Sequence, residues 1–137
     1  MKRRAFLAGT GVALGSLAGC VRTQGSTDQW DVTTTDSKFR PARYEASVGE
    51  TVVWHNTSQR SHTVTAYQDR IPDGATYFAS GGFDSEQAAR DGWKRGLEGA
   101  IHPGESFEHT FETPGTYRYF CIPHEVMGMV GSVVVTK

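Results

Sequence analysis

The sequence predicts one all-β domain built as a β-sandwich. Its 137 residues are about the length of a single ordinary domain. A hydrophobic content of 37% is enough for a core, whereas the 16 glycines and a negative mean hydropathy argue against a long helix bundle and a membrane-embedded protein. From Trp30 onward, apolar residues alternate or form short runs, with turn residues at intervals of about ten positions. This spacing is typical of a β-sandwich, in which two sheets pack in layers.

Seven segments have the pattern expected of strands, and turns rich in Gly, Pro and Asn separate several of them. The predicted strands are 30–35, 44–48, 51–55, 62–67, 106–112, 116–121 and 131–136.

The interval 69–101 does not alternate and is predicted to leave the sandwich as an ordered excursion. Within it, 85–91 is a short helical candidate with Asp84 as its N-cap. Arg90, Lys94 and Arg95 form a local basic cluster, which we interpret as a solvated face rather than a docking patch. We expect the excursion to shield or extend a functional surface.

Residues 1–19 have the composition of an export signal. Three basic residues precede 15 mildly apolar ones, a stretch too short for the roughly 20 residues of a membrane-spanning helix. Arg3-Arg4 resembles a twin-arginine signal, and Leu17-Ala-Gly-Cys20 resembles a lipobox. We therefore predict export and lipid modification of Cys20; the alternative is a plain signal peptide whose cut happens to lie near this cysteine.

Residues 20–29 are polar and are predicted to be a flexible tether between the lipidated Cys20 and the folded domain, 30–137. The domain would then stand at the outer face of the cytoplasmic membrane. With 14 basic and 15 acidic residues, a formal charge of −1 gives no field that would gather nucleic acid, so no nucleic-acid partner is expected.

Cys121 is the only cysteine in 30–137, so it has no partner for an intramolecular disulfide. It begins a tight loop that also carries His124, Met127 and Met129. One thiolate, two imidazoles and a weak thioether are the donors that suit copper in an electron-transfer site. Structural zinc sites usually contain more cysteines in paired spacings.

The second imidazole must come from elsewhere in the chain. His62 opens a predicted strand at the end of the sandwich where the Cys121 loop is also expected. His55 is expected to face outward at a strand end, and His102 lies in a turn. His109 shares parity with neighbouring phenylalanines and is interpreted as a histidine of the inner face rather than a ligand.

Several motifs together resemble the cupredoxins, in particular plastocyanin, pseudoazurin and the membrane-anchored halocyanins. They are Phe39-x-Pro41, Val48-Gly-Glu-Thr-Val-Val-Trp54-x-Asn56, His62-Thr-Val, Pro114-Gly-Thr-Tyr117 and Cys121-x-Pro-His124-x-x-x-Gly-Met129-Val-Gly131. The resemblance covers nearly all of residues 38–136 and implies a Greek-key sandwich of about eight strands. It implies one type 1 copper, cycling between Cu(II) and Cu(I), held by His62, Cys121, His124 and Met129.

Met127 and Met129 share strand parity, but the spacing from Met129 to the final strand matches the family, so Met129 is the expected axial ligand and Met127 part of the rim. The resemblance further implies a monomeric, membrane-anchored electron carrier rather than an enzyme, with membrane redox proteins as partners. Copper delivery or storage is the alternative.

The chain departs from the plastocyanins at three places. Phe120 stands where plastocyanins usually have tyrosine, Ser61 stands where proline is expected, and the 69–101 excursion is longer.

Overall fold

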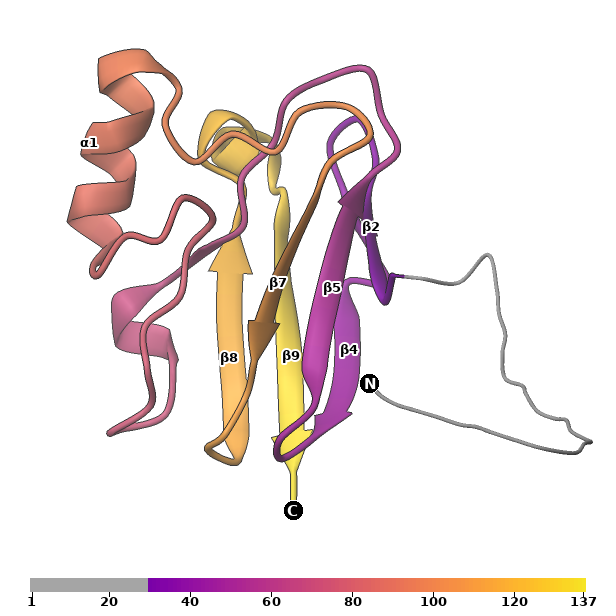
Figure 1. The fold of residues 1–137 in the computed structure, drawn as a ribbon, viewed down its shortest axis with the longest axis vertical. Coiled ribbons are helices and arrows are strands. Elements are labelled where there is room, and N and C mark those ends of the chain that lie inside the picture. The colour runs from indigo at the N-terminus through magenta and orange to yellow at the C-terminus, as the bar shows by residue number, and fades with distance from the viewer. Residues whose placement is uncertain (1–29) are drawn as a thin grey trace, which may run out of the picture.

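The computed structural model describes residues 30–137, which form two four-stranded sheets packed face to face with a helical excursion on one flank (Figure 1). The first sheet has the order β3-β2-β5-β7 and the second the order β4-β9-β8-β6. Their bounds are β2 Val32–Thr34, β3 Phe39–Arg40, β4 Arg43–Ser47, β5 Thr51–Asn56, β6 Thr65–Ala66, β7 Ser106–Thr110, β8 Gly115–Phe120 and β9 Val130–Thr136. The predicted β-sandwich is confirmed.

Alternation along the strands sets the two inner faces. Val52, Trp54 and Asn56 of β5 are fully buried, while the residues between them face outward. Val133 and Val135 of β9 point inward from the opposite sheet. Burial of these apolar side chains supplies the main stabilisation of the sandwich.

Two strands differ from the sequence-based prediction. The short β3 was not expected, and it pairs antiparallel with β2. The predicted strand 62–67 is reduced to β6, because His62 instead pairs with Ile101 of the excursion through an isolated bridge. β6 remains the edge strand of the second sheet, and the excursion pairs with it and with His62 through isolated bridges.

The excursion contains η2 (Gln68–Arg70) and the helix α1 (Glu86–Gly96). The predicted cap was wrong by one residue: the hydroxyl of Ser85, not the Asp84 carboxylate, accepts the N–H of Ala88. The helix also continues to Gly96, beyond the predicted end. Gly92 is needed there because a Cβ would collide with the ring of Phe83.

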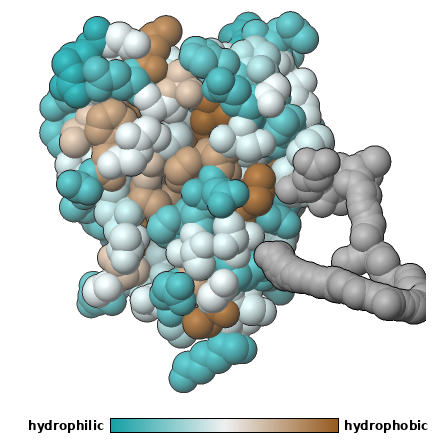
Figure 2. Space-filling model, in the orientation of Figure 1, coloured by the Kyte–Doolittle hydropathy of each residue, from teal (hydrophilic) through white to brown (hydrophobic). Residues whose placement is uncertain are grey.

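In the view of Figure 2, hydrophilic groups cover the outer end of α1, and less polar surface lies where the excursion meets the strands. No helix within residues 30–137 is long and apolar enough to cross a bilayer. The predicted export signal, Cys20 and tether fall outside the described residues.

Candidate metal centre

Three segments that are distant in sequence converge at one end of the sandwich. The loop after β5 leads to His62, the end of β8 leads to Cys121, and the 3-10 turn η3 (Ile122–Met127) carries His124. The turn ends at Gly128, whose φ of 82° is the left-handed conformation that glycine adopts without strain. This glycine lets the chain reverse into β9 directly after the turn.

Both imidazoles face the thiol sulfur. His62 Nδ1 lies 3.5 Å from Cys121 Sγ, and His124 Nδ1 lies 3.4 Å from the same atom. The three donor atoms are all within 4.8 Å of one another. Three soft or borderline donors aimed at one point can hold a transition-metal ion.

Burial sets the protonation states of this cluster. It lowers the pKa of His62 to about 4, helped by the neighbouring His124, so the imidazole is neutral at physiological pH. The pKa of His124 is also lowered, by burial and by the charge of Arg60. Burial raises the pKa of the Cys121 thiol to about 11. Two neutral imidazoles are therefore ready to bind a metal, whereas the thiol must lose its proton.

A buried amide orients His62. Asn56 Nδ2 donates to the carbonyls of Arg60 (2.6 Å) and Ile101 (2.8 Å), and Asn56 Oδ1 accepts from the N–H and hydroxyl of Ser58. Ser58 Oγ lies 2.9 Å from His62 Nε2. A hydrogen bond at Nε2 leaves Nδ1 free to face Cys121.

Thr63 links the His62 segment to the Cys121 segment. Its backbone N–H donates to Cys121 Sγ at 3.4 Å, and its hydroxyl accepts the N–H of Ile122 at 2.9 Å. A donor at the sulfur stabilises negative charge there, and outer hydrogen bonds of this kind tune the potential of a metal centre. The roles of Thr63 and Ser58 were not predicted from the sequence, because the contact of Thr63 with Cys121 joins segments 58 positions apart and the contact of Ser58 with His62 depends on the conformation of the turn.

The two methionines of the loop have opposite environments. Met129 is fully buried within the core cluster that includes Cys121, whereas Met127 is 56% exposed. The Cys121 N–H donates to the carbonyl of Met129, and the Met129 N–H to that of His124. These backbone hydrogen bonds therefore join the end of the loop to its start and to its middle.

The remaining described histidines lie away from the cluster. His55 faces outward, hydrogen-bonded to Ser106, and His102 is an exposed turn residue bonded to Ser61. His109 stacks on Phe78 with ring centroids 4.7 Å apart and is half-buried. None of the three belongs to the group of donors around Cys121.

The basic cluster predicted as a solvated face is divided by the structure. Lys94 and Arg95 are exposed, but Arg90 turns inward and donates to Glu125, the residue after His124. This pair holds the pKa of Glu125 below its usual range, even though burial alone would raise it. The sequence could not reveal it, because the partners lie 35 positions apart.

The chain matches the family described as copper binding proteins, plastocyanin/azurin family, over residues 26–136. It is 35% identical over 97 residues to plastocyanin of Scenedesmus fuscus, covering 71% of this chain and 85% of that protein. Chloroplastic plastocyanin of Tetradesmus obliquus is 32% identical over 97 residues, and the match spans 57% of its length.

Solved structures share the fold. Oxidised plastocyanin of Dryopteris crassirhizoma superposes with a TM-score of 0.51 and 24% identity, covering 77% of this chain and 98% of that one. A methionine-to-leucine variant of amicyanin gives 0.54 and 22%, covering 82% and 86%. The donor set of one thiol and two neutral imidazoles, with a thioether buried in the same core, fits copper. By its sequence match, its fold and this donor set, the chain belongs to the plastocyanin/azurin family of copper-binding proteins, the cupredoxins.

Proposed function

We propose that this chain carries single electrons between redox proteins by means of one type 1 copper held by His62, Cys121, His124 and Met129. The observation that carries the proposal is the position of Cys121 Sγ facing the Nδ1 atoms of both histidines, at 3.5 and 3.4 Å. When bound, the copper supplies a one-electron Cu(II)/Cu(I) couple. Met129 would supply the thioether donor, because it is buried in the same cluster as Cys121, whereas Met127 is exposed.

The role of the protein is to fix the donor atoms before an electron arrives. His62 is held through Ser58 and Asn56, and Cys121 through the N–H of Thr63. Ligands fixed in this way rearrange little between oxidation states, and a small rearrangement favours fast transfer. The burial of His62 and Cys121 also argues against ready release of the metal, which a copper-delivery protein would need.

The direct test is to add one equivalent of Cu(II) to the purified chain and record visible and electron paramagnetic resonance spectra. We expect an intense blue thiolate-to-copper band that is lost in Cys121→Ser. His109→Gln is the control, because this half-buried histidine lies outside the cluster, and it should retain the colour. A chain that binds Cu(II) without a thiolate band would contradict the ligand assignment.

The proposed route for electrons passes through the edge of His124. This side chain keeps 6% exposure whereas His62 has none, and the neighbouring Val126 is 96% exposed. With Pro123 and Met127, Val126 forms an apolar rim that lets a partner approach closely without salt-dependent steering.

Val126→Lys tests this route. The new charge should slow electron self-exchange, measured by NMR line broadening, and leave the visible spectrum unchanged. Val48→Lys is the matched control, since Val48 is also exposed but lies in the turn before β5, at the opposite end of the sandwich. Equal rates in the two variants would contradict the proposed docking edge.

The membrane location is part of the same proposal. It is supported by the signal-like residues 1–19 and the lipobox-like segment ending at Cys20. A lipid on Cys20 would hold a monomeric domain at the outer face of the cytoplasmic membrane, where membrane electron-transfer complexes would be its partners. Mass spectrometry of the membrane-extracted protein tests this: a mature chain that begins at another residue, or an unmodified Cys20, would refute the anchor.

A further inference from the structure

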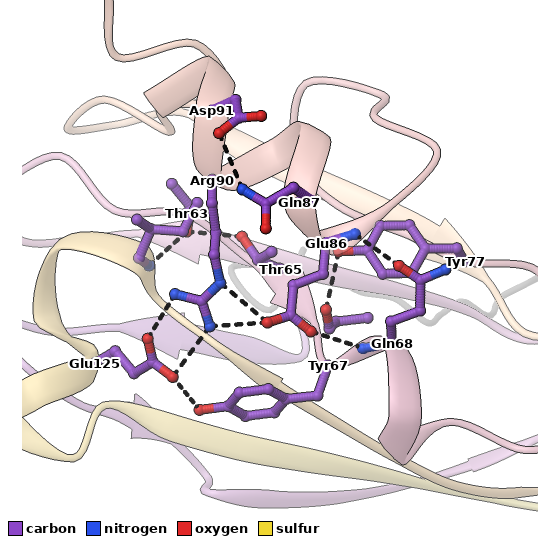
Figure 3. A network of polar contacts seen from close by, with 12 residues as sticks. Thr63, Thr65, Tyr67, Gln68, Tyr77, Glu86, Gln87, Arg90, Asp91 and Glu125 are labelled. Atoms are coloured by element: carbon purple, nitrogen blue, oxygen red, sulfur yellow. Dashed lines mark hydrogen bonds and ion pairs between the residues drawn. The ribbon is translucent and has the colours of Figure 1, made fainter. Parts of the chain in front are cut away.

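One arginine joins the excursion to the loop that bears the proposed ligands. Arg90 of α1 donates from Nη1 to Glu125 Oε1 at 2.9 Å and from Nη2 to Glu125 Oε2 at 3.3 Å. Its Nε also donates to Glu86 Oε2 at 2.9 Å, one turn earlier on the helix. Figure 3 shows the guanidinium lying between the two carboxylates. Glu125 directly follows His124, so the helix is connected to a residue adjacent to a proposed ligand.

The same carboxylate is contacted from a third segment. Tyr67 Oη donates to Glu125 Oε2 at 2.7 Å (Figure 3), and the Tyr67 ring stacks on Phe120 with centroids 4.3 Å apart. The Arg90 guanidinium carbon also lies 4.3 Å from the centroid of the Phe120 ring. Phe120 is fully buried and directly precedes Cys121. The network therefore contacts the metal-binding loop on both sides, before Cys121 and after His124.

Besides this network, the loop is held by its own backbone hydrogen bonds and by the contact of Ile122 with Thr63. η3 is a 3-10 turn, whose hydrogen bonds have poorer geometry than those of an α-helix. Two of its residues, Val126 and Met127, are exposed and contribute little burial. The Arg90 and Glu125 side chains are each only 29% exposed. A bidentate ion pair with this much burial restricts the orientation of both side chains more than a surface pair does.

Further contacts fix the helix end of the network. The Gln68 N–H donates to Glu86 Oε1, and the Glu86 N–H donates to Gln68 Oε1. Ser85 caps the first turn, so the position of Arg90 is determined by the fold of the excursion rather than by a free side chain.

We propose that Arg90 is a positioning residue for the metal centre: by holding Glu125 against Tyr67, whose ring stacks on Phe120, it fixes the backbone of η3 and with it the direction of the His124 imidazole. The excursion then acts as a brace, which means that its contacts restrict the motion of the loop that bears the proposed ligands. This inference rests on the proposed role of His124 as a ligand, but the bracing itself is a property of the chain and can be measured without metal.

The experiment compares amide hydrogen exchange in the metal-free chain and its Arg90→Met variant, which keeps an apolar stem near Phe120. The reporting amides are those of His124, Gly128 and Met129, which donate to carbonyls within the loop. We expect their exchange to be about tenfold faster in Arg90→Met, with β9 amides unchanged. Arg95→Met is the matched control, since Arg95 pairs with Glu98 on the exposed surface of the same excursion and should change neither set.

A second variant and a second measurement guard against a general loss of stability. Glu125→Gln keeps the size of the side chain and removes its charge, and it should also speed exchange in the loop. In the Cu(II)-loaded protein, both variants should release copper to a chelator faster than Arg95→Met does. Wild-type exchange at the loop amides in both variants, or an equal rise in the loop and in β9, would overturn the proposal. Faster loop exchange in a chain that forms no blue copper site would instead refute the ligand assignment and leave the brace intact.

Discussion

Removing the side chain of Asn56 is expected to weaken both the fold and the orientation of His62. Asn56 is fully buried, and its amide makes four hydrogen bonds, two as donor and two as acceptor. A buried hydrogen bond of this kind contributes about 1 kcal/mol net. The carbonyls of Arg60 and Ile101 keep other donors, Ser58 Oγ and the His62 N–H, so part of the loss is recovered. We expect Asn56→Ala to lower the free energy of unfolding by about 3 kcal/mol.

Urea unfolding followed by tryptophan fluorescence measures this loss, in the metal-free and the copper-loaded chain, because a bound metal stabilises the folded state by mass action. Thr57→Ala is the control: this neighbour is exposed, its hydroxyl has a single contact of 3.5 Å with the Thr34 carbonyl, and its removal should cost less than about 0.5 kcal/mol. The reasoning fails if Asn56→Ala loses no more stability than Thr57→Ala.

Three further outcomes are expected. Removing the weak thioether in Met129→Leu should raise the reduction potential measured by voltammetry, and Met127→Leu should barely change it; the opposite order would make the exposed sulfur the ligand. Copper uptake near pH 7 should release about one proton, because the Cys121 thiol is protonated below its pKa of about 11 while the imidazoles are already neutral; calorimetry in buffers of different ionisation enthalpy counts it, and a value of zero or two would refute these protonation states. Tyr117→Phe should cost about 1 kcal/mol, since its hydroxyl donates to a loop carbonyl at 2.6 Å, whereas Tyr119→Phe should cost less, since that buried hydroxyl has no hydrogen-bond partner within residues 30–137; thermal unfolding of both variants decides the order.

Much of the sandwich could be predicted because its strands alternate strongly. In β5 and β9 the period-two pattern coincides with one buried face, so sequence and burial carry the same information. The two-residue strand β3 was missed because two residues are too few to establish a period. The strand predicted from His62 was too long, because pairing with Ile101, 39 positions away, replaces sheet pairing there.

The loop that carries the proposed ligands could be singled out because Cys121, His124 and Met129 lie within nine consecutive residues, but the choice of Met129 over Met127 needed the resemblance to a known family. The groups that position these proposed ligands could not be singled out in this way. Ser58 reaches His62 through a turn held by Asn56, and Arg90 reaches Glu125 from a helix whose packing depends on the whole excursion. Such contacts depend on tertiary structure and cannot be predicted from the local sequence pattern.

The burial of Cys121 also protects its thiol from oxidation in the metal-free protein. Oxidants and disulfide-exchange partners attack the thiolate, and burial both removes access to this sulfur and keeps it protonated. In an oxidising compartment, to which the proposed export would bring the chain, an accessible Cys121 would be open to cross-linking with other proteins or to conversion into sulfenic acid. The folded, metal-free domain is thus expected to keep its thiol reduced until it binds copper.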